Sequence, residues 1–455
     1  MMVDGSQVAQ RNVSIIGAAR SGVAVAGLLL SKGARVFVSD RDPKEKLKSF
    51  LPALKSQGIA FETGGHTPRV YDCSLMVISP GVPSNAPVVL EAQKRGIQVV
   101  SELEVGSWFC PDNVEIVAIT GSNGKTTTTT LIGRVFGDAK KKHVVAGNIG
   151  TAFSSVVLEL VEAGIAVLEV SSFQLDHCET FHPKVSTILN ITPDHMDRYG
   201  NSMEQYAASK ARVFKNQTGD DVLIYDADDE WTARTSQSAV CKRIGFSLRR
   251  PLEEGAFVEN GKLVTILNGV RTEIIETDQI SIRGMHNLYN SMAATLVGQL
   301  MGVSPASIRA TLRNFKGVEH RLEFIRELNG VRYFNDSKAT NVDSVWYALQ
   351  AFAEPIVLLL GGRDKGNDYN RLFELVKQRV KAIVAIGESA EKVEQSFKGM
   401  TVVSRAGSMD DAVSTAKFLA QPGDVVLLSP ACASFDWFKN YEQRGFVFKE
   451  LVNNL

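Results

Sequence analysis

The stretch that most constrains the fold covers residues 115–136 and reads, in three successive parts, EIVAIT, GSNGKTT and TTTLIGRVF. The first part is apolar and rich in β-branched residues, which predicts a buried strand. Gly121 and Gly124 punctuate a short turn, and the third part is typical of a helix with threonines in its first turn. The stretch therefore predicts a strand, a phosphate-binding loop and a helix.

The predicted loop has the chemistry to bind a nucleoside triphosphate. Its glycines let backbone amides surround an anion at the positive end of the following helix. Lys125 adds a positive charge for the β and γ phosphates, and the Thr126 hydroxyl is placed to ligate Mg²⁺. The standard motif has a glycine where this chain has Ile119. A Gly-Ser-Asn turn with a chance lysine is the alternative interpretation.

Length and composition limit the class of protein. A chain of 455 residues is long enough for about three domains. Lys and Arg number 50, as do Asp and Glu, so the zero net charge argues against a nucleic-acid partner. Five cysteines without a C-x-x-C pair favour reduced thiols. The first residues are polar and lack an apolar signal core, and no apolar stretch is long enough for a membrane span, so we expect a cytoplasmic protein without membrane insertion.

The first hundred residues alternate strand and helix patterns. They predict a helix at 23–31 and strands at 13–16, 34–39, 75–79 and 96–101, which is typical of a Rossmann-like, doubly wound unit. Ala19 stands where a dinucleotide site requires its middle glycine, which disfavours a dehydrogenase. Asp40 follows the second strand and could accept a hydrogen bond from a ribose or cap the next helix. The Pro80–Pro83 turn is a ligand-binding edge or a plain loop.

The central region carries acids and a histidine at strand ends. Strands are predicted at 115–120, 165–170, 185–190, 220–225, 242–246, 256–260 and 261–267, with helices at 202–214 and 291–301. Glu169 ends one strand downstream of the phosphate loop, where a magnesium-binding carboxylate belongs. The alternative is an exposed acid beside a helix capped by Ser171. His195 lies in the loop after the next strand, and Lys210 lies on the following helix.

The last third repeats the alternation of strands and helices. Strands are predicted at 332–334, 355–360, 382–386 and 424–428. Three of them run into polar loops, NDSKATN, GGRDKG and SPACAS. Because the carboxyl ends of parallel strands meet at one edge of a sheet, these loops predict a site for a carboxylate or phosphate on a second doubly wound sheet.

The motifs TGSNGKTT, LEVSSFQLD, NITPDHMDRYG, NDSKATN and SPACASFDWFKNYEQRGFVF resemble those of the Mur ligases, which are ATP-dependent amino-acid ligases of peptidoglycan precursor synthesis. The resemblance covers essentially the whole chain. It implies a Rossmann-like UDP-substrate-binding domain at 1–104, a P-loop-type ATP-binding domain at 105–317 and a Rossmann-like amino-acid-binding domain at 318–455. The last two motifs resemble the members that join D-glutamate to UDP-N-acetylmuramoyl-L-alanine.

The family's chemistry implies roles for individual residues. ATP phosphorylates the alanyl carboxylate, and the amine of D-glutamate attacks the resulting acyl phosphate. By resemblance, Lys125 contacts the β and γ phosphates, Thr126 and Glu169 bind a first Mg²⁺, and His195 binds a second. Lys210 matches the family's carbamylated lysine, whose N-carboxylate lies near that metal. This departs from ordinary lysine behaviour, because only a neutral amine reacts with CO₂ and the usual pKa is about 10.4.

The resemblance also implies two sets of ligand contacts. Those for ATP are Gly121, Ser122, Asn123, Gly124, Lys125, Thr126, Thr127, Thr128, Asn290, Arg321 and Asp336. Those for the two substrates are Asn148, Ser171, Lys338, Thr340, Lys365, Ser434, Phe435 and Tyr441.

Two other classes of protein remain open from the sequence. A folate-polyglutamate-type ligase shares the phosphate loop but acts on a pterin, and the last two motifs speak against it. A regulatory nucleotide-binding protein would retain Lys125 without needing Glu169, His195 and Lys210 together. We expect a monomeric enzyme with ATP and Mg²⁺ as cofactors and small-molecule substrates.

Overall fold

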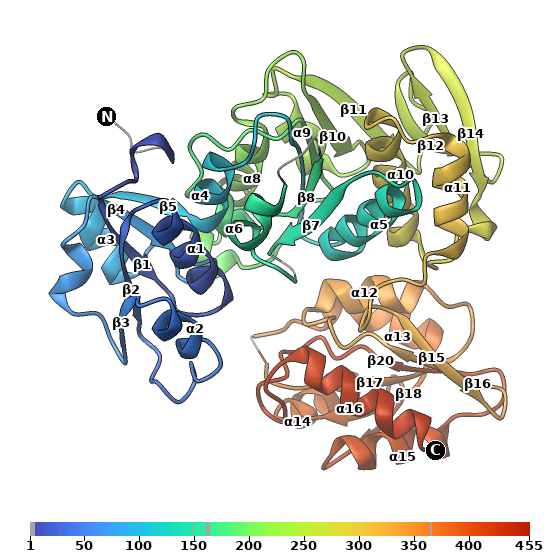
Figure 1. Ribbon diagram of the computed structural model, residues 1–455. Coiled ribbons are helices and arrows are strands. Elements are labelled where there is room, and N and C mark those ends of the chain that lie inside the picture. Colours follow the sequence, from blue (N-terminus) through green and yellow to red (C-terminus); the bar gives the residue numbers. More distant parts are fainter. Residues whose placement is uncertain (1–4, 149, 161–163, 365) are drawn as a thin grey trace. The chain divides into compact units, whose positions relative to one another are not determined.

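The computed structural model describes residues 5–148, 150–160, 164–364 and 366–455. The chain forms two compact units, which Figure 1 colours along the sequence from blue to red. The first unit holds the chain up to Gln279 together with Tyr289–Arg313. The second holds Ile280–Leu288 and Asn314–Leu455. The first unit contains two sheets and the second contains one.

The first sheet is fully parallel, and helices pack on both of its faces. Its strands, in spatial order, are β3 (Ala60–Thr63), β2 (Arg35–Asp40), β1 (Asn12–Ile16), β4 (Leu75–Ile78) and β5 (Gln98–Ser101). Its helices are α1 (Arg20–Ser31), α2 (Leu51–Ser56), α3 (Pro87–Lys94) and α4 (Glu102–Trp108). Ile15 lies in one apolar cluster with Leu29 of α1, whereas the next residue, Ile16, lies in another with Val89 of α3. This alternation buries both faces, as a parallel sheet requires.

The second sheet has nine strands and carries the phosphate loop. Their spatial order is β14 (Val270–Glu276), β13 (Lys262–Leu267), β12 (Gly255–Glu259), β11 (Lys242–Ser247), β10 (Val222–Asp226), β9 (Val185–Ile188), β6 (Glu115–Thr120), β8 (Ile165–Glu169) and β7 (His143–Gly147). Strands β12, β13 and β14 pair antiparallel, and the other pairings are parallel. The helices are α5 (Lys125–Asp138), α6 (Phe153–Val156), α7 (Ser172–Leu175), α8 (Met203–Ala211), α9 (Glu230–Ser236), α10 (Met285–Leu300) and α11 (Pro305–Asn314).

The third sheet is doubly wound. Its strands, in spatial order, are β15 (Glu323–Leu328), β16 (Val331–Asn335), β20 (Val425–Leu428), β17 (Ile356–Gly361), β18 (Val380–Ile386) and β19 (Val402–Arg405). Leu358 and Leu360 of β17 share a core with α12 (Val342–Gln350), α13 (Phe373–Arg379) and α14 (Ala390–Phe397). Val357 and Leu359 share another with α15 (Met409–Leu419) and α16 (Tyr441–Asn453).

The Rossmann-like ends and the central P-loop-type domain confirm the predicted fold class. Five strands, β3, β7, β14, β15 and β19, are not predicted from the sequence, and each lies at the edge of its sheet. The predicted helix at 23–31 begins three residues earlier, at Arg20. The predicted boundary near residue 104 falls inside α4.

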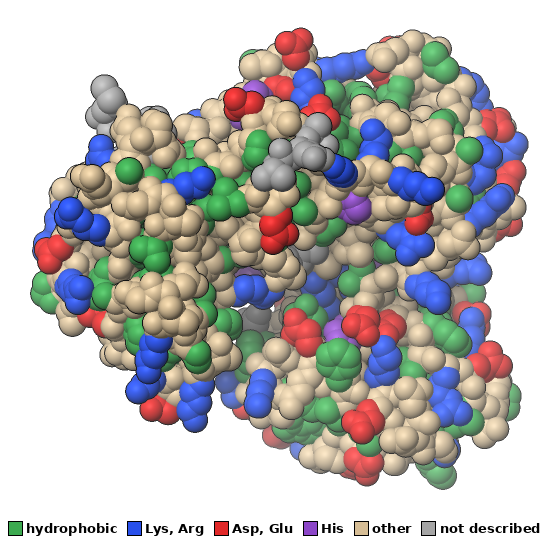
Figure 2. Space-filling model, viewed as in Figure 1, with side chains coloured by type: hydrophobic (Ala, Val, Ile, Leu, Met, Phe, Trp, Pro, Cys, Tyr) green, Lys and Arg blue, Asp and Glu red, His purple; other side chains and the backbone are tan. Residues whose placement is uncertain are grey.

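The charged side chains on the surface reflect the equal numbers of basic and acidic residues in the sequence (Figure 2). On the face drawn in Figure 2, basic and acidic side chains are intermixed. Within the described residues, no helix is both long and apolar enough to span a membrane. All five cysteines are free thiols, and Cys178, Cys241 and Cys432 are buried.

Candidate active site

The phosphate loop lies between β6 and α5, as predicted. Gly121 and Gly124 have φ angles of 146° and 85°, which L side chains rarely adopt. A Cβ on Gly124 would lie 2.4 Å from Oδ1 of Asn290. Gly124 is therefore required both by its backbone conformation and by the close approach of α10. Thr126, Thr127 and Thr128 are buried in the first turn of α5.

The segment after β9, which contains His195, also braces this loop, a role that is not predicted from the sequence. The backbone amide of Asn123 donates to Oδ1 of Asn190 at 2.8 Å, and Nδ2 of Asn190 donates back to the Asn123 carbonyl at 3.1 Å. The Ser122 hydroxyl donates to the Thr192 carbonyl at 2.8 Å. A polar residue directly after a strand that neighbours the loop strand was the available signal.

The ammonium group of Lys125 is hydrogen-bonded to the phosphate loop itself. Its Nζ donates to the carbonyls of Gly121 and Ser122, both at 2.7 Å. Thr128 donates its hydroxyl to Oδ1 of Asn290 at 3.1 Å, so Asn290 of α10 contacts the first turn of α5. The structure thus brings Asn290 next to the phosphate loop, although Asn290 lies 165 residues after Lys125 in the sequence.

Glu169 ends β8 and is 2% exposed. Its Oε1 accepts a hydrogen bond from Nδ2 of Asn148 at 3.0 Å, whereas its buried Oε2 has no hydrogen-bond partner within the described residues. A buried carboxylate oxygen without a partner is costly unless a ligand completes it. Ser171 caps α7 in a capping box with Gln174, so this predicted substrate contact also has a local structural role.

His195 lies in the loop after β9 and has a left-handed backbone, with a φ of 52°. Its side chain is 46% exposed and its ring packs edge-on against Phe173, with centroids 5.0 Å apart. Cζ of the Arg198 guanidinium lies 4.0 Å from the centre of the Phe173 ring. Phe173 thereby joins the loop that carries His195 to the segment that follows Glu169.

Lys210 is almost completely buried in α8, with 1% exposure, although its sequence pattern is that of an ordinary helix lysine. Burial, together with the positive charge of Lys125, lowers the pKa of Lys210 well below its usual value. Its Nζ lies 4.4 Å from the centre of the Tyr206 ring. The neutral amine that carbamylation requires is therefore favoured at this position.

A cavity of about 350 Å³ lies at the carboxyl ends of β1, β2 and β4. Gly147 and Asn148, from the end of β7 onwards, complete its wall. Both sheets of the first unit therefore contribute to the cavity. Through Asn148, the cavity is one hydrogen bond away from Glu169.

Asp40 lines this cavity, and both oxygens of its carboxylate accept hydrogen bonds from backbone amides. Its Oδ2 accepts from the Ala18 amide at 2.6 Å, and its Oδ1 accepts from the Asp42 amide at 2.8 Å. Asp40 thus connects the glycine turn after β1 to the loop after β2. Ala19 also lines the cavity.

In the second unit, the predicted nucleotide contacts Arg321 and Asp336 are close enough for the charge of Arg321 to act on the Asp336 carboxyl group. Asp336 accepts from the Ser429 hydroxyl at 2.8 Å and from the Leu322 amide at 3.3 Å. Burial raises the pKa of Asp336 to about 7, and the charge of Arg321 opposes this rise. The Nε of Arg321 is buried without a hydrogen-bond partner among the described residues.

Four of the predicted amino-acid contacts, Lys338, Thr340, Ser434 and Phe435, lie in the loops after β16 and β20, and Tyr441 begins α16. Lys338 lies with its Nζ 5.6 Å from the centre of the Tyr441 ring. The amide of Thr340 donates to the Lys338 carbonyl at 2.9 Å. Ser434 is buried and Phe435 is 59% exposed. Lys365 lies outside the described residues.

Arg444 joins two of these loops, although it is not among the site residues predicted from the sequence. It donates through Nε and Nη2 to the side chain and carbonyl of Ser337 and through Nη1 to the carbonyl of Cys432, at 2.9, 2.7 and 3.1 Å. Only 1% of it is exposed. Its helical position gives no sequence signal, because charged residues on helices are usually solvated.

Three family models match the chain in order: the MurD N-terminal domain over residues 12–88, the Mur ligase middle domain over 119–298 and the Mur ligase glutamate ligase domain over 320–432. The chain is 46% identical to the UDP-N-acetylmuramoylalanine--D-glutamate ligases of Chloroherpeton thalassium and Salinibacter ruber, and each alignment covers 99% of both chains. The Thermotoga maritima UDP-N-acetylmuramate-alanine ligase MurC matches at 18% identity with a TM-score of 0.62, over 98% of this chain and 100% of that one. At this level of identity, the similarity to the Thermotoga maritima structure shows a shared fold.

The phosphate loop and the three α/β domains therefore match, in order, the domains of an ATP-dependent ligase family. With near full-length relatives at 46% identity, the chain belongs to the Mur ligase family.

Proposed function

We propose that the protein joins D-glutamate to UDP-N-acetylmuramoyl-L-alanine, with hydrolysis of ATP to ADP and phosphate. The observation that carries this proposal is the 46% identity over 99% of both chains to two ligases named for this product. A free carboxylate is a poor electrophile, and its phosphorylation by ATP supplies a leaving group for attack by the amine of D-glutamate. The protein then acts mainly by positioning and charge stabilisation.

In this proposal, the loop of residues 121–128 binds the phosphates, with Lys125 adding charge, and Asn290, Arg321 and Asp336 bind the nucleoside. The nearly full burial of the loop threonines and the contact between Thr128 and Asn290 support this assignment. Five described side chains, Lys338, Thr340, Ser434, Phe435 and Tyr441, together with Lys365, bind D-glutamate. Two lysines facing two carboxylates are a sound electrostatic match.

Asn148 and Ser171 contact the muramoyl-alanine part in this proposal. The position of Asn148 in the wall of the 350 Å³ cavity supports it. The cavity itself accommodates the uridine nucleotide. We place the domain boundaries near residues 104 and 317, between the ranges that the three family models match.

The residues present fit Mg²⁺. Oε2 of Glu169 is buried without a partner among the described residues, and carboxylate and hydroxyl oxygens are ligands that Mg²⁺ prefers. Thr126 and Glu169 would hold one ion, and His195 and a carbamylated Lys210 would hold a second. Bound Mg²⁺ would neutralise the charge of the phosphates. Within the described residues, no three His, Cys, Asp or Glu side chains form a metal cluster, so phosphate and carbamate oxygens would complete these sites.

We further propose that the enzyme acts as a monomer in the cytoplasm. Five free thiols support a reducing compartment.

The test is phosphate release from ATP with Mg²⁺ and UDP-N-acetylmuramoyl-L-alanine. D-glutamate, L-glutamate, L-lysine and meso-diaminopimelate are added separately, and reactions without the UDP substrate serve as blanks. We expect release with D-glutamate alone. Lys125→Ala should abolish release, because the phosphates lose their cationic partner.

Release with a different amino acid would contradict the D-glutamate assignment. An absence of release in every reaction, from folded protein that still binds ATP, would contradict the ligase reaction with this substrate.

A further inference from the structure

Helix α4 connects the first sheet to the central domain and carries two buried glutamates, Glu102 and Glu104, each 1% exposed. They differ in how their oxygens are used. Oε1 of Glu102 accepts from the amide and hydroxyl of Ser154 at 2.7 and 2.6 Å, while its Oε2 has no hydrogen-bond partner within the described residues. Glu104 uses both oxygens.

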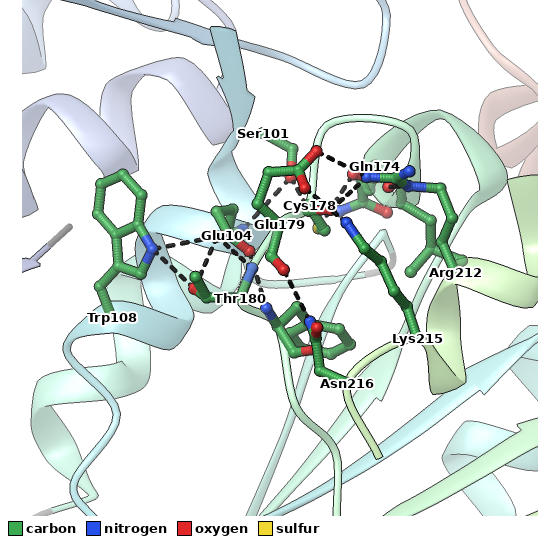
Figure 3. Close-up of polar contacts among 12 residues, drawn as sticks. Ser101, Glu104, Trp108, Gln174, Cys178, Glu179, Thr180, Arg212, Lys215 and Asn216 are labelled. Carbon is green, nitrogen blue, oxygen red and sulfur yellow. Dashed lines mark hydrogen bonds and ion pairs between the residues drawn. The ribbon is translucent and has the colours of Figure 1, made fainter. Parts of the chain in front are cut away.

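Four hydrogen bonds converge on the Glu104 carboxylate (Figure 3). Oε1 accepts from the amide and hydroxyl of Thr180, both at 2.7 Å, and from Nε1 of Trp108 at 3.2 Å. Oε2 accepts from the Phe181 amide at 3.0 Å. Thr180 and Phe181 belong to the central domain, so one carboxylate of α4 satisfies two of its backbone amides.

The central domain holds the same segment, residues 174–181, from its own side (Figure 3). Arg212 donates to the carbonyls of Leu175 and Cys178, and Nδ2 of Asn216 donates to the carbonyls of Glu179 and Phe181. The first-sheet side adds a further bond, from the Ser101 amide to the His177 carbonyl at 2.9 Å. The segment is therefore fixed between α4 and the helix region that follows Lys210.

The fixed segment lies close, along the chain, to the residues that act in the proposed reaction. It begins five residues after Glu169. The cavity has walls from both sheets of the first unit, so its width depends on how these two parts are held together. Gly106 of α4 adds a tight contact, because a Cβ there would lie 2.6 Å from Cδ1 of Phe153.

We propose that Glu104 is a positioning residue that holds the first sheet against the central domain and so sets the cavity in register with Glu169. This role rests on the proposed function only for the identity of the ligand. It predicts that loss of the Glu104 contacts weakens binding of the UDP substrate and leaves ATP binding intact.

The experiment compares Glu104→Gln with Glu102→Gln. In Glu104→Gln, the amide NH₂ replaces Oε2 and meets the N–H of Phe181, so two donors face each other. In Glu102→Gln, the NH₂ replaces an oxygen that has no partner within the described residues. The two variants make the same chemical change on the same helix and at equal burial.

Calorimetry without ATP measures the Kd for UDP-N-acetylmuramoyl-L-alanine, and a separate titration measures the Kd for ATP. We expect Glu104→Gln to raise the first Kd about tenfold and to change the second by less than about twofold. Glu102→Gln should change neither. An unchanged first Kd in folded Glu104→Gln, or an equal rise in both variants, would overturn the proposal.

Trp108→Phe covers the case in which Glu104→Gln does not fold. It removes a single donor and should raise the Kd for the UDP substrate about threefold. No rise would overturn the proposal. Hydrogen exchange of residues 174–181 provides a readout without ligand and should be faster in Glu104→Gln than in Glu102→Gln. If the wild type does not bind the UDP substrate, the proposed function fails, and this exchange difference still decides the role of Glu104.

Discussion

Among the described residues, one lysine is buried in the first unit and one arginine in the second, and the two are held in different ways. Arg444 of the second unit has three hydrogen bonds to Ser337 and Cys432, and burial lowers its pKa only to about 10. Lys210 of the first unit lies over the Tyr206 ring, and burial lowers its pKa well below its usual value. Arg444 is therefore a cation at neutral pH and holds two loops, while burial makes the charged form of Lys210 less favourable than that of an ordinary lysine.

The difference shows how similar burial gives opposite chemistry. A fixed set of carbonyl acceptors compensates a guanidinium for lost water, so the charge is retained as a structural element. At Lys210, burial and the positive charge of Lys125 outweigh the attraction of Asp194 and Asp176, so this lysine loses its proton more easily than an ordinary one. Burial alone therefore does not distinguish a structural cation from a chemical one, whereas the acceptors around it do.

The strongest test of this comparison is Lys210→Arg, together with Lys210→Met. Neither side chain forms a carbamate, so we expect each variant to lose at least about 100-fold in turnover. Carbon-13 NMR in ¹³CO₂ should show a carbamate signal in the wild type that is absent in Lys210→Arg. Lys184→Arg, at a partly exposed lysine, should retain both activity and signal. Full activity in Lys210→Arg would contradict the chemical role.

Arg444→Met tests the structural half of the comparison. It leaves the buried carbonyls of Ser337 and Cys432 without their donor, and we expect a loss of about 3 kcal/mol in the free energy of unfolding. Urea denaturation measures this loss. Arg379→Met is the control, since Arg379 is half-buried and donates to the Phe352 carbonyl alone among the described bonds. It should lose about 1 kcal/mol. Equal losses would show that the bonding of Arg444 is not special.

Asp226 extends the comparison to a buried anion. Burial raises the pKa of Asp226 to about 8, so the folded protein holds this proton more tightly than the unfolded chain does. Its contribution to stability is therefore fully present below about pH 4 and is lost as the pH rises through about 8.

We expect wild-type stability to fall by about 3 kcal/mol more than that of Asp226→Asn between pH 5.5 and pH 8.5. Urea denaturation at both pH values measures the difference. The exposed Asp112→Asn should retain the wild-type pH dependence, and a parallel fall in Asp226→Asn would assign it to other groups.

The sequence predicts interior strands better than edge strands. β17 is apolar throughout and buried on both faces, so its pattern is strong. β3 and β19 have no fully buried residue, because an edge strand on a doubly wound sheet is only partly covered. Their alternation is correspondingly weak. β7 is partly buried along its first three residues and follows three lysines, which hide its pattern.

Candidate site residues were predictable where chemistry resides in a local motif. The loop around Lys125 is one such motif, and its geometry agrees with the prediction. Asn190 and Arg444 lie within quoted motifs, but they act through contacts with segments distant in sequence, so the motifs do not reveal what they hold. The burial of Lys210 likewise depends on tertiary packing, since a lysine on a helix with a weak apolar pattern gives no sign in the sequence that it is buried.

The two hydrogen bonds from Lys125 to its own loop have a consequence for ligand selectivity. A phosphate that enters the loop competes with the Gly121 and Ser122 carbonyls for the ammonium group. Charge-assisted bonds of this kind are about twice as strong as neutral ones, so an incoming group must offer more than a single diffuse negative charge to displace them. A monovalent anion such as chloride therefore competes poorly with the two carbonyls, whereas a polyphosphate chain competes through several charged oxygens at once. We therefore expect this loop to bind a polyphosphate in preference to chloride.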